Sequence, residues 1–392
     1  MVYLQPRLAF NLQLDMVDDE PCTLYLRRAS LSISTQLPIA STITIARVSS
    51  PRAADRTLLA ANLQALTDWF RGCSRAVRQN DIIHVTIDEE QARIGSMVTE
   101  AEVEMDPRDE AAVASHIRAS EANDVYFKVT KLSCTATEFD GTARVVPSVT
   151  TVSQTGVAQS RAPSSIVRPS GKASEYDSLV AILRSGMHPW AAELQMRCTV
   201  LVTGVRGVGK RTLVADAARQ LGVHLLELNC YELQSDSEAK TMAVLNTHFD
   251  RAMAFAPCVL LLKHIEVLAK KSTVAETGQE PLITMAIDEG LGRLAAAHRS
   301  RGHPIMVVAT TDDVDALSIR LLGCFPQQVE LAVPDEQQRY RILCSLTEHV
   351  PLALDVSLVD MANQTAAFVA KDLKHIVHQA AIQALARARQ VR

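Results

Sequence analysis

Apolar and polar residues alternate over short segments in the first third of the chain. The alternating segments are rich in β-branched residues, which predicts strands. The predicted strands are residues 23–34, 41–48, 81–87 and 125–132. Apolar residues recur at helical spacing within residues 54–71, which predicts a helix between the second and third strands. We therefore expect a β-rich α/β amino-terminal domain over residues 1–141.

The composition changes after residue 141. Residues 142–174 are dominated by Ser, Thr, Val, Pro, Gly and Ala, and they contain no carboxylate. Such a segment buries too little apolar surface to offset the entropy lost on ordering. We therefore predict a linker over residues 142–175.

The pattern differs again in the second half, where short apolar runs alternate with helix-length segments. The runs are residues 199–203, 224–228, 259–262, 304–309 and 328–332. Short continuous runs are typical of strands buried on both faces of a parallel sheet. We predict an α/β domain over residues 176–333. Only helical patterns follow, at residues 335–347 and 371–389, which predicts a helical domain over residues 334–392.

Composition excludes several classes of protein. The chain has 40 Lys and Arg against 44 Asp and Glu, a formal charge of -4, so nucleic acid is not expected as a partner. Its eight cysteines are scattered without a C-x-x-C pair, which predicts reduced thiols. The amino terminus has no signal-peptide core, and the apolar runs are too short to cross a bilayer. We expect the chain in the cytosol or peripherally on a membrane.

A glycine-rich loop carries the strongest chemical signal. In TVLVTGVRGVGKRTLV, a strand from Thr199 leads into Gly204, Gly209 and Lys210, which have P-loop spacing, and then into a helix. Such a loop turns backbone N–H groups toward phosphate, and its lysine reaches the β and γ phosphates. We predict that ATP binds here. The predicted contacts are Gly204, Val205, Arg206, Gly207, Val208, Gly209, Lys210, Arg211 and Thr212.

The residue after the lysine departs from the P-loop pattern. A Ser or Thr hydroxyl normally ligates magnesium at this position, and here it is Arg211, whose guanidinium cannot ligate a cation. Thr212 lies about 100° further round the helix and replaces that ligand poorly. We therefore predict no metal ligand here and leave magnesium binding open.

The order of the phosphate loop, CVLLLKHIEVL, VVATTDD and VELAVPDEQQRYRIL resembles that of AAA ATPases. The resemblance implies a P-loop AAA domain with a five-stranded parallel sheet and a carboxyl-terminal helical lid. It also aligns Lys263 and His264 with the acidic pair that binds the metal and activates water, and Asp312 with the asparagine that orients the water. Leu321 and Cys324 align with the arginine fingers, which are worth about 10³ to 10⁵ in rate in other P-loop enzymes. The resemblance therefore implies ATP binding with deficient hydrolysis and no catalytic residue.

Within that family the chain resembles the degenerate first ATPase domain of fungal peroxisome-biogenesis ATPases. The segments that carry the resemblance are GVRGVGK, LLELNCYEL, PCVLLLKHIE, ETGQEP and LLGCF, with a weaker match at residues 70–83. It implies a cytosolic subunit that forms a hetero-hexamer with peroxin one and docks on a tail-anchored protein of the peroxisomal membrane. It also implies a role in extracting and recycling ubiquitinated import receptors.

Three alternatives stay open. The first is an active AAA ATPase or unfoldase with atypical ligands, for instance with His264 as the base. The second is a scaffold that binds no nucleotide. The third is a metal site at His375 and His378, which are spaced i and i+3 on a predicted helix. Apart from Asp372, neither histidine has an acidic or cysteine residue close by in the sequence, which favours two solvated imidazoles.

Overall fold

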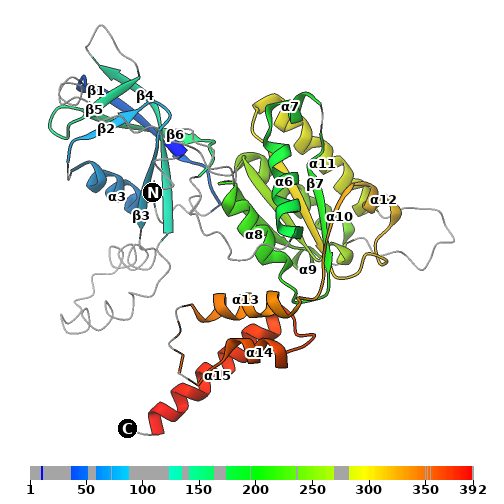
Figure 1. The fold of residues 1–392 in the computed structure, drawn as a ribbon. Helices are drawn as coiled ribbons and strands as arrows, with labels where there is room; N and C mark the ends of the chain where they lie inside the picture. The colour runs from blue at the N-terminus through cyan, green and yellow to red at the C-terminus, as the bar shows by residue number, and fades with distance from the viewer. Residues whose placement is uncertain are drawn as a thin grey trace, which may run out of the picture. The chain divides into compact units, whose positions relative to one another are not determined.

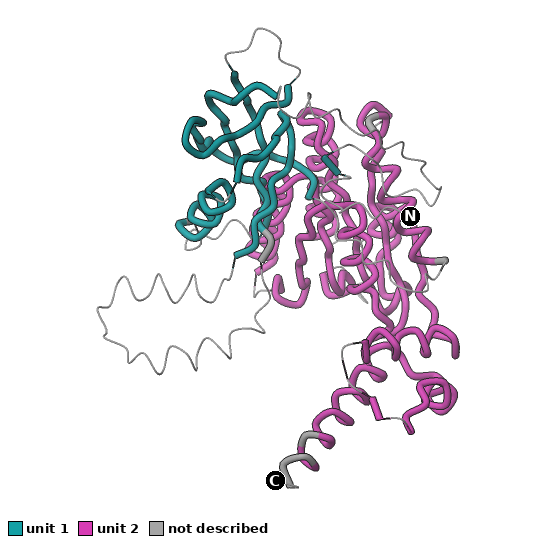
Figure 2. Tube along the Cα trace, turned by 60° about the vertical axis from the view of Figure 1, so that its left-hand side comes forward, with its two compact units in different colours: residues 1–164 teal, residues 165–392 magenta. Residues whose placement is uncertain are grey.

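The computed structural model describes residues 10–11, 37–51, 59–71, 73–87, 123–134, 141–162, 174–194, 196–234, 237–268, 282–348, 350, 352–353 and 355–390. The chain divides into two compact units, Met1–Ser164 and Ser165–Arg392, which Figure 2 colours teal and magenta. Among the described residues, no helix is both long enough and apolar enough to cross a membrane.

Unit 1 is β-rich, as the sequence predicts. Its elements are β1 (Ala40–Val48), α3 (Leu59–Arg71), β2 (Arg75–Arg78), β3 (Ile82–Ile87), β4 (Asn123–Cys134), β5 (Thr142–Val145) and β6 (Thr151–Ala158). Four strands form a sheet in the order β3-β4-β1-β6, and β2 pairs with β5. Alternate residues such as Ile43, Ile45 and Phe127 are buried with Leu66 and Phe70 of α3. Predicted strand 23–34 and the first residues of predicted helix 54–71 lie outside the described residues.

The predicted linker is wrong at residues 142–145 and 151–158, which form β5 and β6 of unit 1. Strand β6 pairs in parallel with β1, from Thr42 opposite Thr151 to Val48 opposite Ala158. Nearly all its side chains are exposed, so the strand has no buried apolar face that would give an alternating pattern. Backbone hydrogen bonds to β1, rather than side-chain burial, hold β6 in the sheet.

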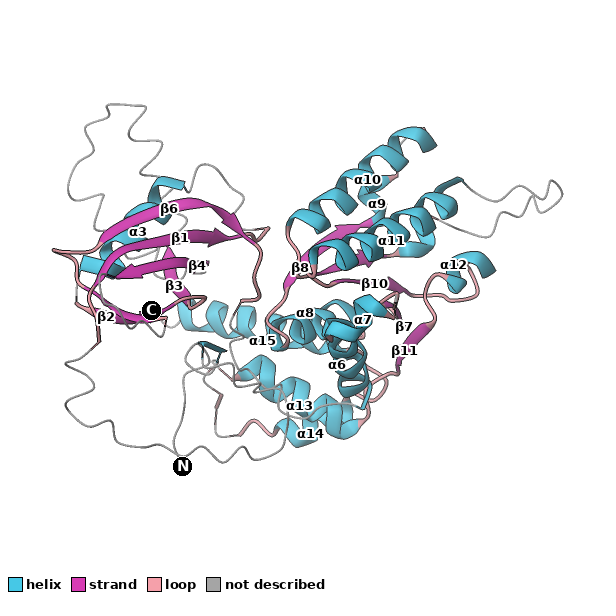
Figure 3. Cartoon of the chain, turned by 90° about the horizontal axis from the view of Figure 1, so that it is seen from above, coloured by secondary structure: helices cyan, strands magenta, loops and turns pink. Residues whose placement is uncertain are grey.

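Unit 2 contains the predicted five-stranded parallel sheet. Its strands are β7 (Thr199–Gly204), β8 (His224–Asn229), β9 (Cys258–Lys263), β10 (Ile305–Thr311) and β11 (Gln327–Leu331), in the order β11-β7-β10-β9-β8. Its helices before the lid are α6 (Ser174–Met187), α7 (Pro189–Glu193), α8 (Lys210–Gln220), α9 (Cys230–Leu233), α10 (Glu238–Ala254), α11 (Leu282–Arg301) and α12 (Ile319–Gly323). Figure 3 shows α10 and α11 on one face of the sheet and α6 and α8 on the other.

Burial on both faces explains the continuous apolar runs of this sheet. Val259–Leu262 of β9 and Val307–Ala309 of β10 are almost completely buried. Because β7, β9 and β10 are parallel, their carboxyl ends meet at one edge of the sheet. Gly204, Lys263 and Thr311 end these three strands, so the predicted site residues that follow them are brought to the same edge.

Three helices form the predicted helical lid: α13 (Glu336–Thr347), α14 (Leu358–Gln364) and α15 (Ala370–Gln390). They appear in orange and red in Figure 1. Asp335 caps α13 through a capping box with Gln338, and Leu343, Ala362 and Leu373 form the core of the three helices. The buried guanidinium of Arg339 donates to the carbonyl oxygens of Ala362 and Pro334, which ties α13 to α14.

Candidate functional site: a phosphate loop with substituted ligands

The glycine-rich loop adopts a conformation that its glycines make possible. Gly204, Gly207 and Gly209 have φ values of 141°, 90° and 113°, in the left-handed region that disfavours other residues. Gly209 is the N-cap of α8, so the loop leads directly into the positive end of an 11-residue helix. This is the strand-loop-helix context that the sequence predicts, and the ATP contacts of residues 204–212 stay a prediction.

The loop lysine is buried and is held by neighbouring oxygens. Lys210 is 8% exposed, and its ammonium donates to the carbonyl oxygens of Gly204 at 2.6 Å and Val205 at 3.1 Å. It also forms an ion pair with Asp312 at 2.6 Å. Asp312 follows β10, so an acid at the position of the family's asparagine neutralises the lysine that the sequence assigns to phosphate.

Two further cations meet at one carboxylate beside the loop. The Nε of Arg211 lies 2.7 Å and the Nζ of Lys263 lies 3.1 Å from the same oxygen of Glu227, on β8. Burial alone would raise the pKa of Glu227, but the hydrogen bonds and charges of Arg211 and Lys263 outweigh it and lower that pKa below its ordinary value. Glu227 in turn raises the pKa of Arg211. Glu227 and Arg211 are therefore both charged at neutral pH.

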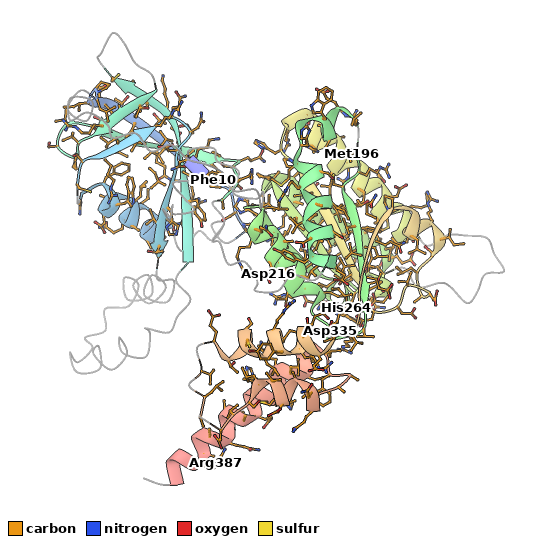
Figure 4. All side chains as sticks on the ribbon, in the orientation of Figure 1. Phe10, Met196, Asp216, His264, Asp335 and Arg387 are labelled. Carbon is orange, nitrogen blue, oxygen red and sulfur yellow. The ribbon has the colours of Figure 1, made fainter. Side chains whose placement is uncertain are left out.

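A second group of side chains follows β9 and β10. His264 has a left-handed backbone, and its Nδ1 lies 3.3 Å from Glu266 and 3.9 Å from Asp312. Glu266 belongs to the short 3-10 helix η3 (Ile265–Val267), and one of its oxygens is buried without a hydrogen-bond partner among the described residues. Figure 4 labels His264 at the end of the sheet where this group lies.

The resemblance to AAA ATPases implies a bound magnesium ion, but the residues at the usual magnesium position are not suitable ligands. Arg211 and Lys263 have no lone pair to offer a cation, and Glu227 already accepts from both. Thr212 is exposed to solvent. His264, Glu266 and Asp312 do place potential ligand atoms within 4.8 Å of one another, but Lys210 already neutralises Asp312.

The positions of the arginine fingers are unsuited to any contact with a neighbouring subunit. Leu321 is fully buried in α12, and Cys324, directly after that helix, is 5% exposed. His375 and His378 are exposed on α15, and the described residues contain no potential metal-binding cluster that includes them.

The lid touches the phosphate loop directly. The backbone N–H of Lys371, in the first turn of α15, donates to the carbonyl oxygen of Gly207 at 3.0 Å. A Cβ atom at Gly207 would lie 3.0 Å from side-chain atoms of both Lys371 and Val369. The loop and the lid are therefore coupled through a glycine that leaves no room for a side chain.

Sequence reasoning missed Glu227, one of the residues of this site. Glu227 belongs to an ordinary strand, and no motif spacing relates it to Arg211 or Lys263. Tyr231, in α9, is 55% exposed, and its ring centroid lies 5.2 Å from that of His264. A charged residue at the end of an apolar strand was the only local signal for Glu227, and that signal is common on protein surfaces.

Comparisons with known proteins agree with this arrangement. Residues 35–162 match the family described as the PEX6 fourth domain, and residues 200–333 match the AAA family, ATPases associated with various cellular activities. Peroxisomal ATPase PEX6 of Yarrowia lipolytica is 28% identical over 414 residues, covering 99% of this chain and 38% of that protein. The PEX6 protein of Cricetulus griseus is 32% identical over 282 residues, covering 68% of this chain and 28% of that protein.

These relatives are longer than the chain. A third, PEX6 of Komagataella pastoris, is 28% identical over 97% of this chain and 35% of its own length. The chain thus spans well under half the length of each of these relatives. The two family matches fall in unit 1 and unit 2 respectively. Residues 200–333 therefore match the AAA family as a domain, and the chain is similar to the PEX6 peroxisomal ATPases over both of its units.

Proposed function

We propose that residues 204–212 bind the phosphates of ATP and that this site hydrolyses ATP poorly or not at all. One observation carries the proposal: the glycine-rich loop keeps its conformation and its lysine, whereas the end of β9 presents Lys263 and His264 instead of two acids. The loop half of the site supports phosphate binding. The strand half lacks the carboxylates that hold a metal and activate water.

In this proposal the nucleotide is structural. The contact between Gly207 and Lys371 supports a role in which ATP fixes the lid against the α/β layer. Bound ligand stabilises the state that it binds by RT ln(1 + [L]/Kd), about 2.7 kcal/mol at a hundredfold excess over Kd. In this proposal the lid angle sets the angle at which one subunit meets the next, so a fixed lid angle would favour ring assembly.

The PEX6 relatives are named peroxisomal ATPases, which supports a role for this chain in peroxisome biogenesis. We propose that it acts in a hetero-hexamer with peroxin one, recruited from the cytosol to a tail-anchored protein of the peroxisomal membrane. There it would help to extract and recycle ubiquitinated import receptors. Association with these partners in cell extracts, with and without ATP, tests this part of the proposal.

Calorimetry tests the binding step. Lys210→Ala removes the ammonium group that reaches the phosphates, and we expect at least a tenfold loss of affinity for ATP, corresponding to about 1.5 to 3 kcal/mol. Lys240→Ala, at an exposed position of α10, is the matched control and should bind like the wild type. Equal affinities for all three proteins would support a scaffold that binds no nucleotide at this loop.

A second candidate function is ATP hydrolysis with His264 as the base. The contact between its Nδ1 and Glu266 favours this alternative, because a carboxylate orients the imidazole in many catalytic sites. Phosphate release separates the two functions. Our proposal predicts little or no turnover by the wild type and no gain of turnover in His264→Glu, because several catalytic groups are absent together and restoring one is not enough. Turnover that His264→Ala abolishes would establish the alternative.

A further inference from the structure

Two cations occupy the positions where the AAA pattern places ligands for magnesium. Arg211 replaces the hydroxyl of the loop, and Lys263 replaces the aspartate at the end of β9. Although 52 residues apart in sequence, the two side chains converge on one oxygen of Glu227. This convergence is a property of the fold that neither segment reveals by itself.

The positive charges of Arg211 and Lys263 are the reverse of what a metal site requires. Magnesium bridges the β and γ phosphates and neutralises part of their negative charge. Its usual protein ligands are neutral or negative oxygens. Here the same places carry positive groups that can contact phosphate oxygens directly, and a guanidinium does so with several donors in one plane.

We propose that this site binds ATP without magnesium, with Arg211 and Lys263 supplying the positive charge that the metal supplies in other AAA domains. The inference rests on the proposed function, because it concerns the form of ATP that the same loop takes. It goes beyond that function by identifying the bound species as the metal-free anion. It also assigns roles to two side chains that lack any role in the hydrolytic pattern.

Glu227 acts as a positioning residue in this arrangement. It holds both cations beside the loop, and its side chain is 23% exposed whereas that of Arg211 is 66% exposed. The guanidinium can therefore rotate from Glu227 toward an incoming phosphate without unpacking the core. Lys210 also contributes positive charge to the site once a phosphate replaces Asp312 as its partner.

Titration calorimetry of the full chain with ATP, in EDTA and in excess magnesium, tests the inference. We expect the dissociation constant in EDTA to be no higher than in magnesium, because free ATP carries more negative charge and a metal ion would be repelled by the two cations. Binding that is clearly weaker in EDTA overturns the inference and leaves the proposed function intact. Absence of binding in both buffers overturns the two together.

Variants test the role of the side chains. Arg211→Thr restores the hydroxyl of the P-loop pattern, and we expect about a tenfold loss of affinity in EDTA with a smaller loss in magnesium. Lys263→Met, which keeps the length of the side chain, should change affinity in the same direction. Arg219→Thr is the matched control, since Arg219 is at the far end of α8 and pairs with Asp216. Melting temperatures without nucleotide verify that each variant folds.

The affinities of the variants for ATP in EDTA either support or overturn the inference. A loss of affinity in EDTA for Arg211→Thr and Lys263→Met, with Arg219→Thr unchanged, supports the inference. Unchanged affinity in EDTA for both site variants overturns it, even if the wild type binds ATP without metal, because the positive charge must then come from elsewhere.

Discussion

The ammonium group of Lys210 lies 2.6 Å from the carboxylate of Asp312, which follows a strand 102 residues further along the chain. Lys210 is the residue that the loop pattern assigns to phosphate, and the AAA pattern has a neutral asparagine where Asp312 lies. An ion pair of this kind competes with phosphate for the same ammonium group. ATP binding at this loop therefore requires the lysine to leave Asp312.

Asp312→Asn tests this competition. The substitution removes the charge that retains Lys210 and a negative charge near the phosphates, so we expect affinity for ATP to rise about fivefold, corresponding to about 1 kcal/mol for a partly exposed pair. Calorimetry in EDTA measures the change. Asp315→Asn, at an exposed position in the same loop, should have no effect. Weaker binding by Asp312→Asn would contradict competition.

Gly207→Ala tests the contact between the loop and the lid. Alanine at a φ of 90° is strained, and its Cβ would crowd Lys371 and Val369, so we expect a loss of about 1 to 3 kcal/mol in the free energy of unfolding. Hydrogen exchange should also become faster at the amide of Lys371, which donates to Gly207. Gly323→Ala meets no neighbouring atom within 4 Å and is the control. Unchanged exchange at Lys371 would show that the contact is dispensable.

Glu227→Gln tests the carboxylate that holds the two cations. The folded-state pKa of Glu227 lies below its ordinary value of 4.5, so its contribution to stability is complete above pH 4.5 and is lost as the pH falls through the lower, folded value. We expect the variant to be about 1 kcal/mol less stable at neutral pH and to lose less stability than wild type below pH 4.5. Urea denaturation across pH measures both effects.

The control for this pH dependence is Glu330→Gln, at an exposed position of β11. This variant should keep the acid-induced loss of stability that the wild type shows. If Glu227→Gln and Glu330→Gln have the same pH profile, the ion pairs of Glu227 contribute nothing measurable to stability.

Gly290→Ala tests the packing of α10 against α11. A Cβ at Gly290 would collide with the ring of Phe249, which is completely buried, so we expect a cost of about 1 to 3 kcal/mol. Gly292→Ala lies in the same helix with open space around it, and it should stabilise the protein by up to about 1 kcal/mol through helix propensity. Thermal unfolding of both variants measures the difference, and destabilisation of equal size by both would refute the packing argument.

The sequence by itself determined the elements and the class of unit 2. Continuous apolar runs fixed the five strands because both faces of the sheet are buried, and the order of runs and helices fixed a parallel arrangement. The spacing of Gly204, Gly209 and Lys210 predicted the turn between β7 and α8, because the positive φ values of its glycines are a local property of the backbone. Local patterns of this kind can be read without knowing what lies nearby in space.

Only the tertiary structure decided the rest. The sequence did not reveal strand β6, because its place in the sheet depends on backbone pairing with β1 and not on an apolar face. Thr151 of β6 pairs with Thr42 of β1, which lies 109 residues earlier in the chain. The pairing of Lys210 with Asp312 and the convergence of Arg211 and Lys263 on Glu227 join side chains from different strands. A charged side chain gives no local sign of its partner, because the ion pair depends on which strand ends the fold brings together.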